Sequence, residues 1–216
     1  MRKSFFFLFL IVILLVACTN DSFKTGDSEY SYLQSDFVEA TTNTNAAFVS
    51  AVTDNGDTLL LHSALSAKWA TKADTTYRAQ LYYNRNNLEV VPIAISKVYV
   101  LPVSQQPHTT NTPDPMGFTS AWIAKTRKYI NLELALKTGN NTENKQSLGV
   151  SLENVASSVS GTNKYTLRLL HQQNNVPQYY TVRTFVSIPT TFAHKGDSIE
   201  VHINTYKGEV IKAFIL

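Results

Sequence analysis

Hydrophobic and polar residues alternate along much of this chain. From Tyr129 to Lys137 the apolar residues Ile, Leu, Leu and Leu occupy every second position, and Ile199 to Ile203 follows the same rule. No stretch keeps the 3.6-residue period of an amphipathic helix. A period of two is typical of half-buried β-strands, so the pattern predicts an all-β fold.

Turn signals separate further apolar runs. The cluster Asp54 to Asp57 (DNGD) lies between two such runs and predicts a β-hairpin. Tyr206 to Glu209 predicts another turn before the last strand. Further strands are expected at Tyr77–Tyr83, Glu89–Val103, Phe118–Ile123, Ser147–Leu152, Tyr165–His171 and Tyr179–Ile188. Short, evenly spaced strands favour a sandwich or a barrel.

A proline-rich segment interrupts this series. Residues 102–115 contain four prolines and few apolar side chains, which is typical of a boundary between domains. We therefore expect a signal peptide at 1–17, a lipidated tether at 18–35, a first β domain at 36–105, a linker at 106–115 and a second β domain at 116–216.

The N-terminus has the form of an export signal. Arg2 and Lys3 precede the uncharged run from Phe5 to Val16, which is shorter than the roughly 20 residues of a spanning helix. The run ends at Ala17-Cys18 and resembles a bacterial lipobox, with a small residue before the cleavage point and the chain's one cysteine after it. This predicts cleavage between Ala17 and Cys18 and attachment to membrane lipid through Cys18. The alternative is an ordinary secretory signal beside an unrelated cysteine.

The charge balance argues against nucleic acid as a partner. Of 19 basic residues, Arg2 and Lys3 leave with the signal, so 17 face 16 acidic residues and the net charge is +1. No basic stripe remains to contact phosphates.

The residues that could carry catalysis form no recognisable set. The histidines are not at metal-ligand spacing: they are His62, His108, His171, His194 and His202. The chain has no Gly-x-Ser-x-Gly elbow, no GxGxxG and no P-loop. We therefore expect no metal, no cofactor and no enzymatic activity. His202, on a polar strand face, is expected to be solvent exposed.

Aromatic side chains are the remaining candidates for binding. Tyr82 and Tyr179 lie opposite the apolar faces of their expected strands, and Trp69 lies in a polar stretch. Each is a candidate contact for a glycan or a peptide, while packing in the core is the alternative for each.

Several segments resemble NigD-like bacterial lipoproteins. The run DPMGF at 114–118, Trp122 and YINL at 129–132 resemble the start of that family's C-terminal domain, and TLRLLH at 166–171 resembles its next strand. Ala47 to Leu61 resembles its N-terminal hairpin. The resemblance implies a small OB-like barrel followed by an antiparallel β-sandwich. It also implies a role in immunity to a bacteriocin, and it supplies no catalytic or ligand residues.

The sequence thus predicts a non-enzymatic, lipid-anchored binding or accessory protein of the cell envelope. Thr19 after the cysteine is not an acidic inner-membrane retention signal, so a Gram-negative outer membrane is favoured. The partner is a protein toxin if the role is immunity. The alternatives are a surface adhesin for glycans or proteins, and a hydrolase with an unrecognised site.

Overall fold

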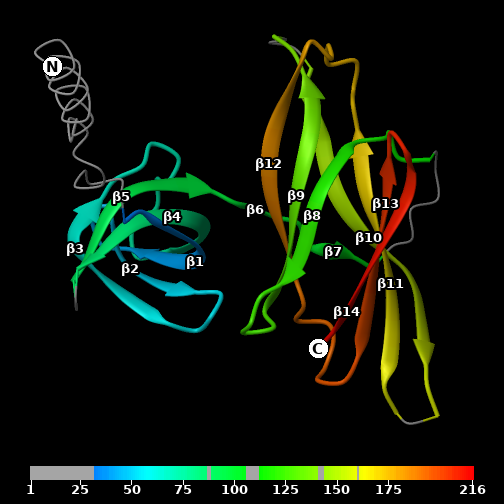
Figure 1. The fold of residues 1–216 in the computed structure, drawn as a ribbon, viewed down its shortest axis with the longest axis horizontal. Helices are drawn as coiled ribbons and strands as arrows, with labels where there is room; N and C mark the ends of the chain where they lie inside the picture. The colour runs from blue at the N-terminus through cyan, green and yellow to red at the C-terminus, as the bar shows by residue number, and fades with distance from the viewer. Residues whose placement is uncertain (1–31, 87–88, 106–111, 141–143, 160) are drawn as a thin grey trace, which may run out of the picture. The chain divides into compact units, whose positions relative to one another are not determined.

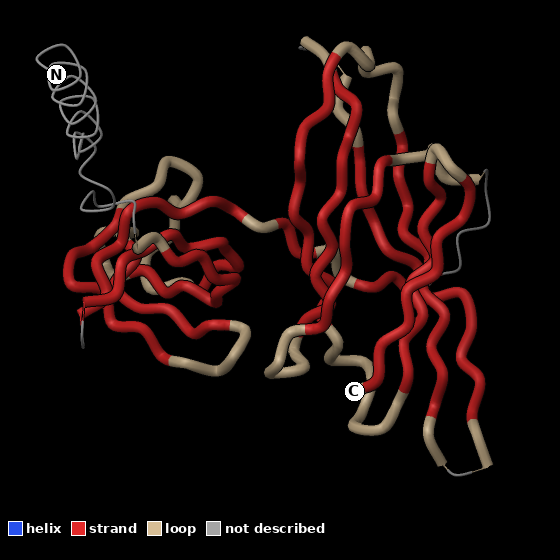
Figure 2. Tube along the Cα trace, viewed as in Figure 1, coloured by secondary structure: helices blue, strands red, loops and turns tan. Residues whose placement is uncertain are grey.

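The computed structural model describes residues 32–86, 89–105, 112–140, 144–159 and 161–216. Its described part consists of strands joined by loops, with no helix (Figure 2). These strands all lie in one compact unit from Gln34 to Leu216. The predicted all-β class is therefore confirmed. Within the described ranges, no helix is long and apolar enough to cross a membrane. Residues 1–31, including Ala17 and Cys18, lie outside the described part.

The first five strands close into a barrel in the order β1-β2-β3-β5-β4 (Figure 1). Their bounds are β1 Gln34–Thr42, β2 Phe48–Thr53, β3 Thr58–Leu65, β4 Thr76–Asn86 and β5 Glu89–Lys97. The predicted hairpin is β2–β3. Gly56 adopts a φ of +95° in its turn, and the Thr53 hydroxyl accepts the Asp57 N–H at 3.1 Å. Glycine reaches this left-handed conformation without the steric cost that other residues incur.

The barrel core is small and includes several aromatic residues. Phe48, Leu59 and Leu81 are fully buried in it. Strand β1 was not among the expected strands, and its first residues were assigned to the tether. Its inward positions Val38, Ala40 and Thr42 mix small and polar side chains, so they give a weaker alternation than the leucines of later strands.

The remaining strands form two packed sheets. One has the order β6-β12-β9-β8 and the other β14-β13-β11-β10-β7. Figure 1 shows β8, β9 and β12 side by side in the first sheet. The bounds are β6 Tyr99–Val100, β7 Val103–Ser104, β8 Gly117–Ile123, β9 Tyr129–Thr138, β10 Ser147–Ser157, β11 Asn163–Gln172, β12 Tyr180–Pro189, β13 Ser198–Thr205 and β14 Gly208–Ile215.

The predicted sandwich is confirmed, but its sheets are mixed rather than wholly antiparallel. β11 pairs with β13 in parallel, as do β10 with β7 and β12 with β6. The chain passes from β11 to the other sheet, runs back as β12, and returns as β13. Because β12 runs in the opposite direction within the other sheet, the chain has turned round twice by the time it reaches β13. β13 therefore points the same way as β11, beside which it lies.

The segment Tyr99–Ser104 contributes one short strand to the edge of each sandwich sheet. β6 lies beside Val186 and Ser187 of β12, and β7 lies beside Val150 and Ser151 of β10. From the sequence these residues were expected in the first domain, because an apolar run identifies a strand without identifying its partner. In the structure the chain leaves the barrel at Val98, whose N–H donates to the Arg78 carbonyl at 3.1 Å.

The sandwich core contains the positions that the alternation predicts. Ile130, Leu132 and Leu134 of β9 are fully buried. They pack against Leu167 and Leu169 of β11 in the facing sheet. Apolar burial on this scale is the main favourable contribution to folding.

Candidate functional site

A buried polar cluster joins the barrel to the outer face of the sheet that contains β9 and β12. Arg78 of β4 has a side chain only 2% exposed, and its two terminal nitrogens donate to the Asp54 carboxylate at 2.7 Å each. Arg78 also donates to Ser187 at 3.1 Å and to Asn131 at 3.0 Å. This two-pronged pairing matches the planar guanidinium to the planar carboxylate.

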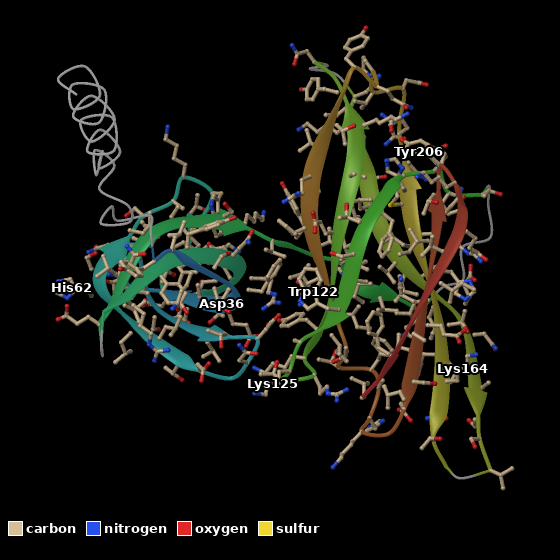
Figure 3. All side chains as sticks on the ribbon, viewed as in Figure 1. Asp36, His62, Trp122, Lys125, Lys164 and Tyr206 are labelled. Carbon is tan, nitrogen blue, oxygen red and sulfur yellow. The ribbon has the colours of Figure 1, made fainter. Side chains whose placement is uncertain are left out.

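Aromatic rings surround this cluster. Phe37 of β1 packs edge-on against Trp122, which Figure 3 labels, and against Phe185, with ring centroids 5.3 Å apart in both pairs. The Arg78 guanidinium lies 4.2 Å from the centre of the Tyr129 ring, a favourable cation–π distance. The barrel and this sheet are therefore held together by specific contacts.

Titratable groups at the edge of the junction bind one another. Glu39 accepts hydrogen bonds from Lys128 at 2.7 Å and Tyr129 at 2.9 Å. Burial alone would raise the pKa of Glu39, but these two donors outweigh it and the pKa falls below its ordinary value. Burial and the bond to Glu39 raise the pKa of the Tyr129 hydroxyl to about 12.

The loops at the end of the sandwich that holds the β11–β12 and β13–β14 connections form a polar surface. Hydrogen bonds bring them together: Gln173 N–H donates to Asp114, Asn174 donates to the Lys145 carbonyl, and Asn204 donates to the Pro113 carbonyl. Met116 forms a β-bridge with Thr205 beside the last turn. We call this region the distal loop surface: residues 112–116, 139–140, 144–146, 173–180 and 206–207.

The loop between β11 and β12 is held in one conformation. Gln173 Nε2 donates to the Val176 carbonyl at 2.7 Å and to the Lys137 carbonyl at 3.1 Å. Asn174 and Asn175 have φ values of 49° and 58°, a left-handed conformation that asparagine tolerates better than most residues. Because Val176 is buried, the loop is fixed by both polar and apolar contacts.

Three tyrosines project from the distal loop surface. Tyr179 is 80% exposed, Tyr180 50% and Tyr206 41%. The Tyr179 N–H donates to the Thr138 carbonyl at 2.9 Å, and its ring lies over Gly139, where an added Cβ would come within 2.9 Å of the ring carbon Cδ2. Burial and the nearby charge of Asp114 raise the pKa of the Tyr206 hydroxyl. Figure 3 labels Tyr206 in this part of the sandwich.

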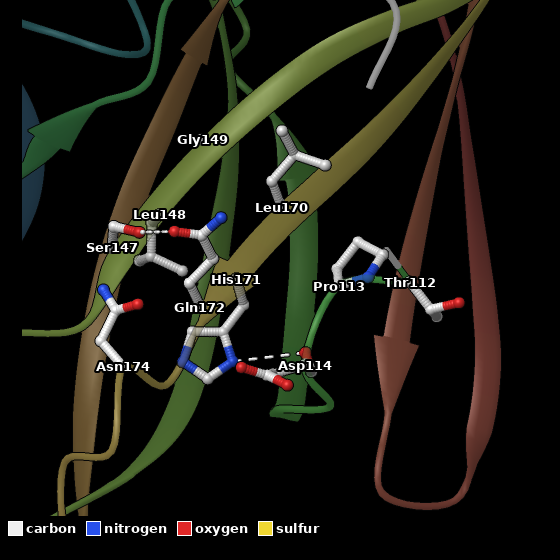
Figure 4. Close-up of a pocket in the computed structure, with 10 residues that line it drawn as sticks. All are labelled: Thr112, Pro113, Asp114, Ser147, Leu148, Gly149, Leu170, His171, Gln172 and Asn174. Carbon is white, nitrogen blue, oxygen red and sulfur yellow. Dashed lines mark hydrogen bonds between the residues drawn. The ribbon is translucent and has the colours of Figure 1, made fainter. Parts of the chain in front are cut away.

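Two hollows of about 390 Å³ each lie among these loops. The first is mainly polar (Figure 4), and its lining residues are Thr112, Pro113, Asp114, Ser147, Leu148, Gly149, Leu170, His171, Gln172 and Asn174. His171 is buried, and its ring nitrogens lie 3.3 Å from the Asp114 carbonyl oxygen and 3.3 Å from Gln146 Oε1. His171 therefore ties the loops together.

The second hollow lies beside the end of β9 and the start of β12 and has a partly apolar lining. Leu136, Val176 and Val182 line it together with Thr138, Gly139 and Lys145. Val182 is 43% exposed, although it follows the inward-facing register of β12. The sandwich core is thus left open to solvent beside Tyr179 and Tyr180.

The three predicted binding aromatics lie apart from one another. Tyr179 belongs to the distal loop surface, and Tyr82 is half-buried on barrel strand β4. Trp69 packs on Phe48 and Tyr77 at centroid distances of 5.3 and 5.5 Å, so its ring contributes to the barrel core. The structure places neither Tyr82 nor Trp69 beside Tyr179.

The sequence gives no sign of some other features. Alternation places Asn131 on the face of β9 opposite the leucines, and it is fully buried there because the barrel covers that face. The expectation that His202 is solvent exposed is wrong. Its side chain is 16% exposed and lies between Glu209 at 3.4 Å and Glu200 at 3.8 Å. Tyr180 and Tyr206 lie next to turn signals, and turn composition does not distinguish an exposed ring from a packed one.

The described ranges contain no group of three or more His, Cys, Asp or Glu side chains arranged to hold a metal ion. The hydroxyls, amides and rings of the distal loop surface can donate, accept and stack, which are the interactions of a binding surface.

Known structures share this fold. The chain superposes on a crystal structure of a NigD-like immunity protein from Bacteroides caccae with a TM-score of 0.63 and 20% identity, covering 84% of this chain and 96% of that one. A candidate toxin-related protein from Parabacteroides distasonis gives 0.65 and 15%, covering 85% and 93%. A candidate lipoprotein from Bacteroides fragilis gives 0.56 and 10%, covering 84% and 96%.

No protein-family model matches the chain, and no curated protein matches it by sequence. The structural likeness therefore concerns the fold. It includes both the barrel and the sandwich, because it extends over more than four fifths of the chain. The expected resemblance to NigD-like proteins is confirmed at this level.

Proposed function

We propose that this protein is a non-enzymatic, lipid-anchored binding protein of the cell envelope, and that the distal loop surface contacts its partner. The observation that carries the proposal is the group of exposed tyrosines on a hydrogen-bonded loop. Tyrosine offers a large apolar face and a hydroxyl while losing little conformational freedom.

The fixed loop supports a role in binding. Ordering a mobile side chain costs about 0.5–1.5 kcal/mol on association. Gln173 and Val176 already hold the loop that presents Tyr179 and Tyr180. Much of that cost is therefore met during folding, and contacts made by the tyrosines contribute more directly to affinity.

The anchor is proposed from the sequence motif at Ala17-Cys18. One acyl chain gives only reversible attachment, whereas the two or three chains of a lipoprotein give a stable one. Intact-mass measurement of the membrane-extracted protein should show an acyl adduct at Cys18 and loss of residues 1–17. Cys18→Ala should abolish both. Absence of the adduct from the wild-type protein would contradict the anchor, and fractionation on a density gradient tests the proposed outer-membrane location.

The role that we favour is immunity or envelope defence. Two structural neighbours are described as an immunity protein and a candidate toxin-related protein. A tether at the membrane raises the local concentration of a binding surface at the place where a toxin arrives. The test is deletion of the gene followed by challenge with the bacteriocin made by the same strain. The deleted strain should be more sensitive than its parent, and equal sensitivity would refute the immunity role.

A further inference from the structure

We infer that the distal loop surface binds an acidic polypeptide segment, which inserts an apolar side chain into the second hollow, beside β9 and β12. The inference rests on the proposed binding function and specifies the chemistry of the partner. It depends on three observations at the same end of the sandwich: an open, partly apolar hollow, flanking tyrosines, and more lysines than carboxylates among the described residues.

The hollow has the character of an anchor pocket. Its floor is formed by Leu136, Val176 and Val182, and its volume of about 390 Å³ lies within the range of small-molecule pockets. Val182 remains 43% exposed at the end of an inward-facing row. A leucine, isoleucine or phenylalanine from a partner would continue that row and cover it. Central, well-packed anchors of this kind dominate the affinity of many protein interfaces.

The tyrosines stand next to this hollow. Gly139 lines the hollow and also lies beneath the Tyr179 ring, where there is no room for a Cβ. Tyr180 follows directly at the start of β12, with half of its surface exposed. The two rings can therefore pack on the backbone of a segment whose side chain occupies the hollow.

Among the described residues at this end of the sandwich, lysines outnumber carboxylates. Lys145 lines the hollow, Lys207 lies in the turn between β13 and β14, and Lys137 Nζ is held 4.3 Å from the centre of the Tyr206 ring. Among the described residues none of these three lysines forms an ion pair, although the structure holds several ion pairs elsewhere. The described carboxylate of this surface, Asp114, already accepts the Gln173 N–H at 2.7 Å. Acidic side chains on a partner would complement this surface.

The probe that follows is a library of short synthetic peptides with a central leucine, isoleucine or phenylalanine flanked by glutamate and aspartate. Binding to the full chain in detergent micelles is measured by fluorescence anisotropy. Members of this library should bind. Matched peptides with glutamine and asparagine in place of the acids, or with serine in place of the central residue, should bind about tenfold more weakly.

Variants locate the binding. Tyr179→Ala and Lys145→Glu should each weaken binding of the acidic peptides by about tenfold or more, with the melting temperature unchanged, because both side chains are exposed. The matched controls are Tyr32→Ala, which removes a tyrosine that is 69% exposed elsewhere, and Lys195→Glu at the opposite end of the sandwich. Both controls should bind as the wild type does.

Three results would overturn the inference: no binding by any acidic peptide, equal binding of the neutral peptides, or equal effects of Tyr179→Ala and Tyr32→Ala. Binding of an acidic polysaccharide such as alginate, with the same dependence on Tyr179 and no peptide binding, would also overturn it. If the peptides bind as predicted but gene deletion leaves bacteriocin sensitivity unchanged, the immunity role fails and this inference stands. If deletion sensitises the strain but no peptide binds, this inference fails alone.

Discussion

At the scale of single residues, Arg78 contributes to two parts of the molecule at once. It belongs to a barrel strand, yet its partners include Asn131 and Ser187 of the sandwich. Every nitrogen of its guanidinium has an acceptor, so the buried charge is both paired and hydrogen-bonded. A satisfied charge of this kind is costly to disturb, because removing one partner leaves the other buried alone.

Replacing Arg78 with methionine should therefore lower the free energy of unfolding by about 3–5 kcal/mol. The matched control is Arg183→Met. Arg183 likewise forms an ion pair, with Glu133 at 2.8 Å, but its side chain is 71% exposed. Loss of such an exposed pair costs about 0–1 kcal/mol. Urea unfolding of both variants measures the difference. Equal losses of unfolding free energy would show that the buried Arg78 pair stabilises the protein no more than the exposed Arg183 pair does.

Asp197 gives a prediction for low pH. The backbone N–H groups of Asn163 and His194 donate to its carboxylate at 2.7 and 2.8 Å, and they lower its pKa below the ordinary value of 3.8. A lowered pKa in the folded state contributes stability that is present above the unfolded pKa and is lost as the pH falls through the folded pKa. Asp197→Asn should therefore be less stable than the wild type at pH 5.

The difference in melting temperature between wild type and Asp197→Asn should shrink between pH 5 and pH 2. Thermal unfolding followed by circular dichroism at several pH values provides the measurement. If the difference in melting temperature stays constant down to pH 2, the charge of the Asp197 carboxylate contributes nothing to stability.

At the scale of elements, the close pairing of β8 with β9 depends on Gly117. A Cβ at this position would lie 2.6 Å from the Ala135 carbonyl oxygen and 2.8 Å from the Ala135 Cβ. These atoms belong to the neighbouring strand and cannot move without disturbing the sheet. The pairing also contains a register irregularity between Phe118 and Ser120, so this edge has a geometry that the sequence pattern does not reveal.

We expect Gly117→Ala to destabilise the protein by about 1–3 kcal/mol, which is the usual cost of overpacking. Gly149→Ala is the control, since a Cβ there would have its nearest neighbours at an ordinary 3.8 Å. That substitution should be neutral or slightly stabilising, because glycine loses more freedom on folding than alanine does. Chemical denaturation of both variants tests this, and similar stabilities would show that the sheet relaxes around Gly117.

The sequence predicts the strands better than it predicts their partners. Alternation correctly assigned the inward residues of β9, because Ile130, Leu132 and Leu134 enter a large apolar core. It does not reveal that Asn131 is buried, because a polar face covered by a second module resembles a solvated one in sequence. It also gave no sign that β11 and β13 are parallel, since pairing direction depends on the route of the chain between them.

The candidate site was partly predictable for the same reasons. The alternating pattern placed Tyr179 opposite the apolar face of its strand, and in the structure its side chain is exposed. The hollow beside it could not be predicted, because it arises where Val182 of one sheet lies at the open end of a core built by both. Lys145 and Lys207 come to this end through separate turns, and no spacing in the sequence connects them.

At the scale of the whole molecule, barrel and sandwich are joined by more than the chain. Phe37, Arg78 and Glu39 of the barrel contact the sandwich through rings, an ion-pair cluster and hydrogen bonds. Whether the two modules also fold as separate domains stays a prediction, and limited proteolysis tests it at residues 102–115. Cleavage there after loss of the N-terminal segment is expected, and lasting protection would argue for one fused domain.

The central claim is that a tethered protein acts through its distal loop surface. The most direct measurement is complementation of the deleted strain, scored as survival under bacteriocin challenge, with wild-type protein or with Tyr179→Ala/Tyr180→Ala at equal abundance in the membrane fraction. Both rings are exposed, so the variant should fold and reach the envelope normally. The account predicts that wild type restores survival and that the variant does not. Full restoration by the variant would contradict it.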